Sequence, residues 1–346
     1  MTSSSDFKPT NILIIGGTGT IGAYITSTLL SSPDPKPYTT LTLFTRPGFD
    51  SDPSSAKAQL ITHWQSLGLR IVTGSVESFS QTDFTKVFED GSFDTIISCL
   101  GRATLQYQPK IIDAAEASEK VKWFLPSEFG TDVEYNERSK DELTHVGKLA
   151  LRKHVREKVK RLKVTYVVTG PYFDMWLYPT PGYPQAGGFE PKEKKAWIVG
   201  DGEGKVGFCT MWDVGRFVLA TLLHPAQSFN KALKVQSFVV TPNQVLAEFE
   251  KQTGGTKFDV TYTPLSEIEK LETVLWDKEN IDGKPQPKPQ ATPVTLRRIW
   301  AQGGTLYEKN DNELLEVKEE DSDTLEEGVR RYLRGGYKTE TFGVRE

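Results

Sequence analysis

Short apolar runs alternate with amphipathic stretches along the first half of the chain. The apolar runs predict six strands: Asn11–Ile15, Thr40–Phe44, Arg70–Val72, Thr95–Ser98, Lys122–Leu125 and Val164–Val168. The stretches between them predict five helices: Gly19–Leu30, Ser54–Leu67, Gln81–Glu89, Gln106–Ser118 and Asp141–Leu162. Unbroken apolar strands are typical of parallel strands buried on both faces, and helices between them supply the crossovers. We therefore expect an α/β fold with a doubly wound parallel sheet and a smaller C-terminal α/β lobe.

The pattern changes after Gly170. Residues 178–188 are rich in proline, glycine and aromatic side chains, which predicts a loop or lid. A strand near 196–199 and a helix over 212–223 resume the earlier alternation, whereas the polar, proline-bearing residues 277–293 predict an exposed insertion. Two units follow from these boundaries. The first is a domain over 1–170, to which 196–240 return, and the second is a substrate lobe and lid formed by 171–195 and 241–346.

A glycine-rich loop directly follows the first predicted strand: Gly16-Gly17-Thr18-Gly19-Thr20-Ile21-Gly22. A phosphate held at a helix N-terminus needs backbone N–H groups that point at it and no side chain in the way. The spacing is GxxGxxG rather than the commoner GxGxxG, but its place at the start of a βαβ series is the context that dinucleotide binding requires. We therefore expect a Rossmann-like domain over 1–170. Its predicted cofactor contacts are Gly16, Thr18, Gly19, Thr20, Ile21 and Gly22.

The end of the second predicted strand distinguishes the two nicotinamide dinucleotides. NAD binders usually carry a carboxylate there, which holds the ribose 2′-OH. In this chain Arg46 follows the strand and the next acid is Asp50. A guanidinium presents a fixed fork of donors that fits a 2′-phosphate, and Lys57 could add a second positive charge. Arg46 and Lys57 therefore predict NADPH as the cofactor.

Further segments of the chain form a recognisable set with this loop and Arg46. They are Phe124-Leu-Pro-Ser-Glu-Phe-Gly130, the helix that holds Lys148, and the block Gly200-Asp-Gly … Thr210-x-x-Asp213-Val-Gly215. Together they resemble the NmrA-like and isoflavone reductase-like family of atypical short-chain dehydrogenase/reductases, which includes phenylcoumaran benzylic ether and pinoresinol–lariciresinol reductases. The resemblance covers residues 11–240 well and the last hundred residues loosely. It implies an NADPH-dependent oxidoreductase with Lys148 as the catalytic residue and Arg152 and Lys57 as cofactor-contacting residues.

The chain departs from the plant members of that family at three places. Thr20 stands in the glycine loop where they usually have tyrosine, and Thr169-Gly-Pro-Tyr-Phe173 replaces their N-x-F segment. The predicted insertion at 277–293 is the third departure. Because all three lie near or beyond the expected substrate site, the plant substrates do not carry over to this chain.

A lysine acting by itself is the best candidate for the proton chemistry. None of the twelve tyrosines has a lysine four residues later, which excludes the usual tyrosine–lysine pair of short-chain dehydrogenases. A lysine beside positive charge has a lowered pKa and exchanges a proton near neutral pH. Lys148 and Arg152 are four residues apart and share one helix face. The alternative is a solvated helix face, since basic residues recur throughout 148–163.

Other polar and aromatic residues stand near the predicted strand ends. His145 and His154 flank the same helix, Cys99 ends the fourth strand, and Ser127 and Glu128 follow the fifth. The residues Tyr172, Phe173, Trp176, Tyr178 and Tyr183 would either line an apolar pocket over the nicotinamide or pack the C-terminal lobe. A lined pocket would suit a small aromatic or polyketide-like substrate.

Three function classes are compatible with these features. The first is an NADPH-dependent reductase that transfers a hydride to a small, aromatic or polyketide-like molecule, as in secondary metabolism. The second is an NAD(P)-sensing regulator of the NmrA type that binds the dinucleotide without turnover. The third is an epimerase that borrows the nucleotide and consumes no net NADPH. Lys148 favours the reductase.

The composition narrows the partners. The 346 residues carry a formal net charge of −4, which gives no electrostatic case for a nucleic-acid partner. The two cysteines are far apart in the sequence, so neither a disulfide framework nor a metal site is expected. The N-terminus lacks an apolar leader and no run of 18 apolar residues occurs, so we expect a cytoplasmic protein without a membrane partner. A monomer or homodimer is expected.

Overall fold

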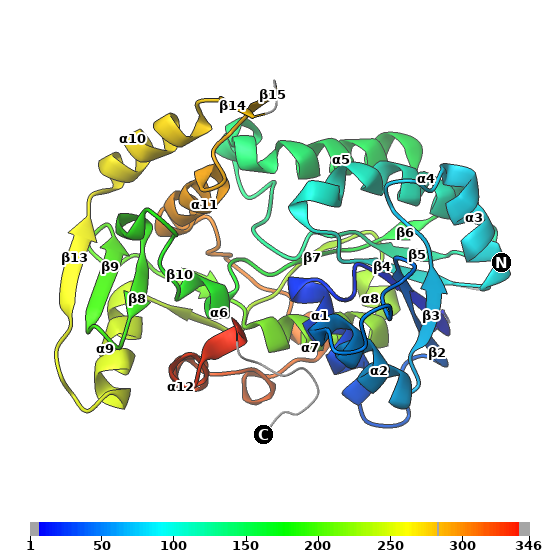
Figure 1. Ribbon diagram of the computed structural model, residues 1–346, viewed down its shortest axis with the longest axis horizontal. Coiled ribbons are helices and arrows are strands. Elements are labelled where there is room, and N and C mark those ends of the chain that lie inside the picture. Colours follow the sequence, from blue (N-terminus) through cyan, green and yellow to red (C-terminus); the bar gives the residue numbers. More distant parts are fainter. Residues whose placement is uncertain (1–6, 282–283, 339–346) are drawn as a thin grey trace.

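A six-stranded parallel sheet forms the N-terminal half of the protein in the computed structural model, which describes residues 7–281 and 284–338. Its strand order is β3-β2-β1-β4-β5-β6 (Figure 1). The strands are β1 (Asn11–Ile15), β2 (Thr40–Thr45), β3 (Arg70–Thr73), β4 (Thr95–Ser98), β5 (Trp123–Leu125) and β6 (Lys163–Val164). The order reverses between β1 and β4, as in Rossmann-like sheets. The predicted doubly wound α/β fold is confirmed.

Helices cover both faces of this sheet. They are α1 (Thr20–Ser31), α2 (Ala56–Ser66), α3 (Gln81–Asp90), α4 (Gln108–Ala117), α5 (Val146–Lys158) and α7 (Met211–Leu223). One apolar cluster joins the sheet to α1, α2 and α7, and a second joins it to α3, α4 and α5. The predicted helix over 141–162 is shorter, because α5 begins at Val146 and ends at Lys158. Two short 3₁₀ turns precede it, η2 (Glu137–Asp141) and η3 (Leu143–His145), with Glu142 between them. Within this segment the Glu142 carboxylate is held by Arg298 at 2.5 Å.

The sixth predicted strand is divided in two at Thr165. Residues 163–164 pair with β5, whereas β7 (Tyr166–Val168) pairs in parallel with β11 (Ala232–Lys234). The buried Thr165 hydroxyl donates to the Ser228 carbonyl at 2.7 Å and accepts from the Trp123 indole at 2.9 Å. These two long-range hydrogen bonds fix the backbone at the division.

A smaller lobe follows in the chain. Its three-stranded sheet has the order β13-β9-β8, with β8 (Gly188–Glu190), β9 (Lys195–Val199) and β13 (Asp259–Thr263). The remaining elements outside the main sheet are α6 (Phe173–Trp176), β10 (Val206–Phe208), α8 (Pro225–Ser228), β12 (Phe238–Val240), α9 (Pro242–Gln252), α10 (Leu265–Trp276), β14 (Glu279–Ile281), β15 (Lys284–Gln286), α11 (Ala291–Ala301) and α12 (Leu325–Leu333). Thus the range 196–240 contributes β9 to the lobe and α7 and β11 to the N-terminal unit. The predicted insertion at 277–293 holds the β14–β15 hairpin and the start of α11, and its residues 282–283 lie outside the described residues.

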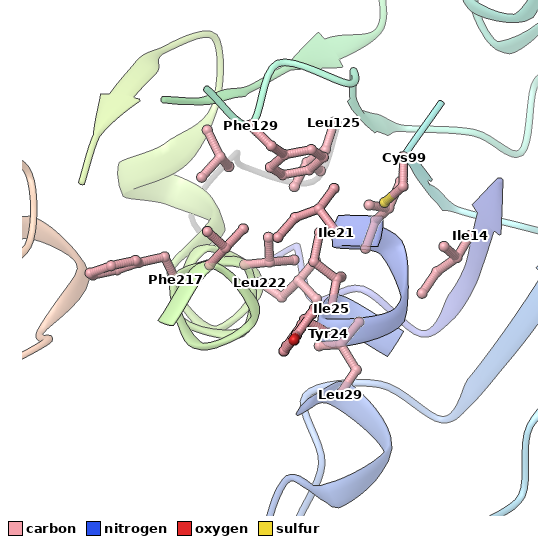
Figure 2. Close-up of a cluster of buried hydrophobic side chains, with 14 of the residues drawn as sticks. Ile14, Ile21, Tyr24, Ile25, Leu29, Cys99, Leu125, Phe129, Phe217 and Leu222 are labelled. Atoms are coloured by element: carbon pink, nitrogen blue, oxygen red, sulfur yellow. The ribbon is translucent and has the colours of Figure 1, made fainter. Parts of the chain in front are cut away.

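Apolar packing fastens α7 to the glycine-loop helix. Ile25 of α1 is fully buried and belongs to the same apolar cluster as Phe217 and Leu222 of α7, with Leu222 on the side of α7 that faces α1 (Figure 2). Ile14 and Cys99 close the same cluster from the sheet side. Burial of side chains of this size stabilises a fold by about 1.5–3 kcal/mol each. The C-terminal half of the chain is therefore part of the core under the glycine loop.

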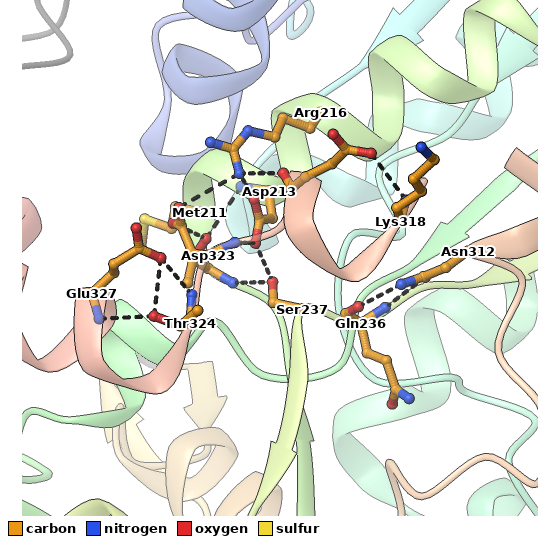
Figure 3. A network of polar contacts seen from close by, with 12 residues as sticks. Met211, Asp213, Arg216, Gln236, Ser237, Asn312, Lys318, Asp323, Thr324 and Glu327 are labelled. Carbon is orange, nitrogen blue, oxygen red and sulfur yellow. Dashed lines mark hydrogen bonds and ion pairs between the residues drawn. The ribbon is translucent and has the colours of Figure 1, made fainter. Parts of the chain in front are cut away.

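A buried carboxylate network joins α7 to the C-terminal segment. Asp213 accepts a hydrogen bond from Ser237 at 2.5 Å and from the Asp323 backbone at 2.8 Å, and it pairs with Arg216 (Figure 3). Asp323 in turn accepts from Thr210 at 2.7 Å. Thr210 and Asp213 belong to one of the sequence blocks that carry the family resemblance, and here they hold the segment around Asp323 against α7.

None of the described helices is both long enough and apolar enough to cross a membrane.

The close approach of α1 and α7 gives a stability prediction. A Cβ at Gly215 of α7 would overlap the Thr28 side chain and come within 3.0 Å of the Tyr24 carbonyl. Because the carbonyl is fixed in its helix, we expect Gly215→Ala to lower the free energy of unfolding by about 1–3 kcal/mol. Urea unfolding would measure this. In the control Gly147→Ala, the new Cβ meets nothing within 4 Å, so stability should be equal or higher. Equal stabilities for the two variants would contradict the packing account.

Candidate active site

The glycine loop makes a compact turn between β1 and α1. Gly16 has a φ of +81°, and a Cβ there would lie 2.7 Å from the Cys99 carbonyl of the neighbouring strand end. A Cβ at Gly22 would overlap the Gly16 carbonyl. Gly19 is the residue before α1, and no side chain caps that helix. The first N–H groups of α1 therefore remain available to an anion beside a surface formed by Thr18, Gly19 and Thr20.

Arg46 extends from the carboxyl end of β2 and is about two-thirds exposed. Its guanidinium forms an ion pair with Glu77, which follows β3. Ser75 also donates to Glu77, and this hydrogen bond is the largest cause that lowers the pKa of the carboxyl group, with Arg46 contributing less. Lys57 lies exposed in the first turn of α2, without an ion pair to any residue the structure describes. Both predicted cations are thus solvent-facing, and Glu77 is a counter-charge that the sequence reasoning did not weigh.

Lys148 lies in the first turn of α5 against the segment that follows β5. It is half-buried, and its Nζ donates to the Glu128 carbonyl. The pKa of Lys148 is lowered to about 8, mainly by burial; the Glu128 carboxylate opposes this shift, and the charges of Arg102 and Arg152 add to it. From the sequence, we expect neighbouring positive charge to lower the pKa of Lys148. Here desolvation is the larger cause. At neutral pH the ammonium form predominates, with the free amine accessible.

Two further residues lie near Lys148: Arg102, which the sequence did not indicate, and His145, which it placed only beside the same helix. Arg102 follows the carboxyl end of β4, donates to Thr144 at 3.3 Å, and has a pKa lowered by burial. His145 is buried, its Nδ1 faces Ser139 at 2.8 Å, and its Nε2 has no hydrogen-bond partner among the described residues. Burial first, then the Lys148 charge, lower the pKa of His145 to about 4, so its ring is neutral. Arg102 could have been predicted from its position just after the fourth strand, because ligands bind at the carboxyl ends of such strands.

Arg152 lies one helical turn after Lys148 and is only 1% exposed. Its guanidinium donates to Glu128 at 3.1 Å, Asp132 at 3.0 Å and Glu134 at 3.0 Å. It also lies over the Tyr166 ring at 4.8 Å. These partners occupy both terminal nitrogens, so Arg152 is held in a carboxylate cluster beneath Lys148. Its predicted cofactor contact stays a prediction.

The other polar candidates have mainly structural contacts. Ser127 donates to the Leu100 carbonyl at 2.8 Å, and His154 pairs with Asp113 of α4 at 2.7 Å. Cys99 is buried, and burial raises the pKa of its thiol, which does not favour a nucleophile. Among the described residues, no group of three or more His, Cys, Asp or Glu side chains is placed to hold a metal ion.

Some of the aromatic residues after β7 pack inside the C-terminal lobe, and one borders the candidate site. Phe173 and Trp176 belong to the buried aromatic cluster of the C-terminal lobe. Tyr178 packs against Tyr332, with ring centroids 4.6 Å apart. The Tyr172 hydroxyl donates to the Phe129 carbonyl in the segment that also receives Lys148. Tyr172 is therefore the aromatic residue of this set that borders the candidate site.

Comparisons with known proteins place these features in a family. The sequence model of the NmrA-like family matches residues 8–282. An isoflavone reductase-like protein of Olea europaea is 30% identical over 75% of this chain and 79% of its own length. The phenylcoumaran benzylic ether reductase of Betula pendula is 28% identical over 89% of both chains.

Solved structures have the same fold. The leucoanthocyanidin reductase of Vitis vinifera in complex with NADPH has a TM-score of 0.74 at 22% identity, and covers 93% of this chain and 99% of its own. An isoflavone reductase has a TM-score of 0.72 at 24% identity, again over 93% of this chain and 99% of its own. The resemblance inferred from the glycine loop, residues 124–130 and the Lys148 helix is confirmed. This chain belongs to the NmrA-like family.

Proposed function

We propose that this protein is an NADPH-dependent oxidoreductase that reduces a small, aromatic or polyketide-like substrate, with Lys148 as general acid/base. The observation that carries the proposal is the position of Lys148. Its Nζ lies against the segment after β5, at the sheet edge where dinucleotide folds bind their ligands, with a pKa lowered to about 8. The matched relatives named as reductases support the reaction class.

The residues of the glycine loop fit a dinucleotide. A Cβ at Gly16 or Gly22 would fill the turn, and the uncapped N-terminus of α1 offers N–H groups to a pyrophosphate. Arg46 is exposed where the adenosine ribose of such a nucleotide would lie, and its fork of donors suits a 2′-phosphate. NADPH, which the matched leucoanthocyanidin reductase binds, would supply the hydride.

Lys148 would supply the proton that accompanies this hydride. Hydride addition to a carbonyl, or to the C=C bond of an enone, places negative charge on the substrate oxygen. An ammonium group beside that oxygen donates a proton as the charge develops. The Glu128 carbonyl orients Nζ, and the Arg102 charge keeps the proton transferable by disfavouring the ammonium form. The lysine is then reprotonated from water.

Replacement of Lys148 tests the catalytic role. We expect Lys148→Met to lower kcat by about 10²–10⁴-fold while the Kd for NADPH stays within about twofold. Substrate-dependent NADPH oxidation measures kcat, and nucleotide fluorescence measures binding. Lys153→Met, at an exposed position on the same helix, is the control and should keep full activity. Full activity of Lys148→Met would refute the assignment. NADPH binding by the native protein without oxidation over a panel of phenolic, quinone and enone substrates would support the sensing alternative.

The pH dependence follows from the same pKa. An ammonium that donates a proton is present below its pKa and is lost above it. We therefore expect kcat/KM for reduction to fall as the pH rises through about 8, and Lys148→Met to lose this limb of the profile. A native profile that stays flat between pH 7 and 9.5 would contradict the role of Lys148 as general acid.

Arg46 tests the choice of nucleotide. We expect Arg46→Ala to raise the KM for NADPH by about 10–100-fold and to leave the KM for NADH nearly unchanged, because a charge-assisted contact to the 2′-phosphate is lost. Glu77→Gln removes the competing carboxylate, so its KM for NADPH should be equal or lower. Initial-rate kinetics with both nucleotides measure these values. An equal rise for NADPH and NADH would mean that Arg46 contacts the adenosine rather than the phosphate.

Arg152 tests the positioning role that its contacts support. Arg152→Met would remove the ion-pair partner of the buried Glu128 carboxylate and leave Asp132 with Lys234 at 3.4 Å, so we expect a loss of about 3–5 kcal/mol in the free energy of unfolding. Arg156→Met is the control, because its exposed pair with Glu134 is worth about 0–1 kcal/mol. Unchanged stability of Arg152→Met together with a rise of more than about tenfold in the Kd for NADPH would favour the cofactor contact instead.

A further inference from the structure

Arg297 is a buried arginine without a carboxylate partner among the residues that the structure describes. It lies in α11 and is 7% exposed. One terminal nitrogen, Nη2, donates to the carbonyls of Trp176 at 2.6 Å and Tyr178 at 2.9 Å. The other, Nη1, is buried and has no hydrogen-bond partner among the described residues. Burial lowers the pKa of Arg297 to about 9.

Other arginines of this chain that point into the protein form ion pairs with carboxylates. Arg298, the next residue in α11, pairs with Glu142 and Glu272, both at 2.5 Å. Arg331 pairs with Asp174 at 3.1 Å and with Asp323 at 2.7 Å. A buried cation without a counter-charge is costly, and proteins normally pair it. The missing partner of Arg297 therefore requires an explanation of its own.

Arg297 lies in the wall of a hollow in the C-terminal lobe. The hollow has a cavity volume of about 90 Å³ and lies between β9 and α11. Three indole side chains line it, those of Trp176, Trp197 and Trp300, and the Arg297 guanidinium lies 5.1 Å from the Trp176 ring. None of the residues of the glycine loop, and neither Lys148 nor Arg152, is among its lining residues. The hollow is thus separate from the candidate active site.

A glycine keeps the space beside the unpartnered nitrogen. Gly187 also lines the hollow, and its φ of +108° is a conformation that other residues rarely adopt. A Cβ at this position would come within 3.2 Å of Nη1 of Arg297. A side chain at position 187 would therefore crowd the Arg297 nitrogen that has no acceptor among the described residues.

We propose that this hollow binds a small aromatic monocarboxylate, with its carboxylate on Arg297 and its ring between the indoles. A guanidinium edge favours a planar carboxylate, and such charge-assisted bonds are stronger than neutral ones. Indole faces favour a flat apolar ring over the hydration shell of an inorganic anion. Binding supplies the counter-charge that Arg297 lacks among the described residues, and it places a second ligand in the C-terminal lobe.

Benzoate is a suitable probe, with benzamide as its neutral isostere and inorganic phosphate as the non-aromatic anion. Calorimetric titration of the full chain should give binding of benzoate, and at least about tenfold weaker binding of benzamide and of phosphate. Tryptophan fluorescence should change with the same midpoint. Equal affinities for benzoate and benzamide, or for benzoate and phosphate, would overturn the proposal.

Two variants locate the ligand. Arg297→Met removes the charge and should weaken benzoate binding by at least about tenfold, whereas Arg70→Met, at an exposed position on β3, should not. Because Arg297 also holds two carbonyls, thermal unfolding must show that the variant is folded. Ala301→Leu keeps Arg297 and fills the hollow from α11, and it should also abolish benzoate binding. Native affinity in folded Arg297→Met, or in Ala301→Leu, would refute the site.

Discussion

The two ends of Glu128 hold the candidate site together. Its backbone carbonyl accepts from the Lys148 ammonium, and its carboxylate accepts from Arg152. Both cations belong to α5. Glu128, which follows β5, therefore fixes this helix against the sheet through both its backbone carbonyl and its side chain. Glu128 is 1% exposed, and its partner Arg152 also pairs with the Asp132 carboxylate. Such a pair contributes little net stability when complete, but it is costly to break. It therefore specifies where Lys148 lies.

The electrostatics of Lys148 result from a balance within this cluster. Burial and the positive charges of Arg102 and Arg152 lower its pKa, while Glu128 raises it. Without the carboxylate, the pKa of Lys148 would be lower still. Without burial, the lysine would hold the proton too tightly to release it. An amine with a pKa near the operating pH is suited to proton transfer in both directions.

The C-terminal half of the chain connects two sites. α11 holds Arg297 toward the indole-lined hollow and Arg298 toward Glu142, just before the start of α5. Farther along, the Asp213–Asp323 network fastens the C-terminal segment to α7, which packs under the glycine-loop helix. The lobe is thus linked to the N-terminal unit through buried ion pairs and apolar contacts.

The sequence by itself determined the elements whose signals are local. Apolar strands and amphipathic helices have short periods, and the loop from Gly16 to Gly22 needs its glycines for contacts within one turn, so both were predictable. The position of Lys148 one turn before Arg152 followed from helical spacing. The tertiary structure alone decided which charges meet. It divided the strand at Thr165, enclosed Arg152 in carboxylates and brought Arg102 beside Lys148. It also left Arg297 without a counter-charge from any residue that the structure describes. These outcomes depend on residues tens to more than a hundred positions apart, and no periodic pattern records which of them the fold brings together.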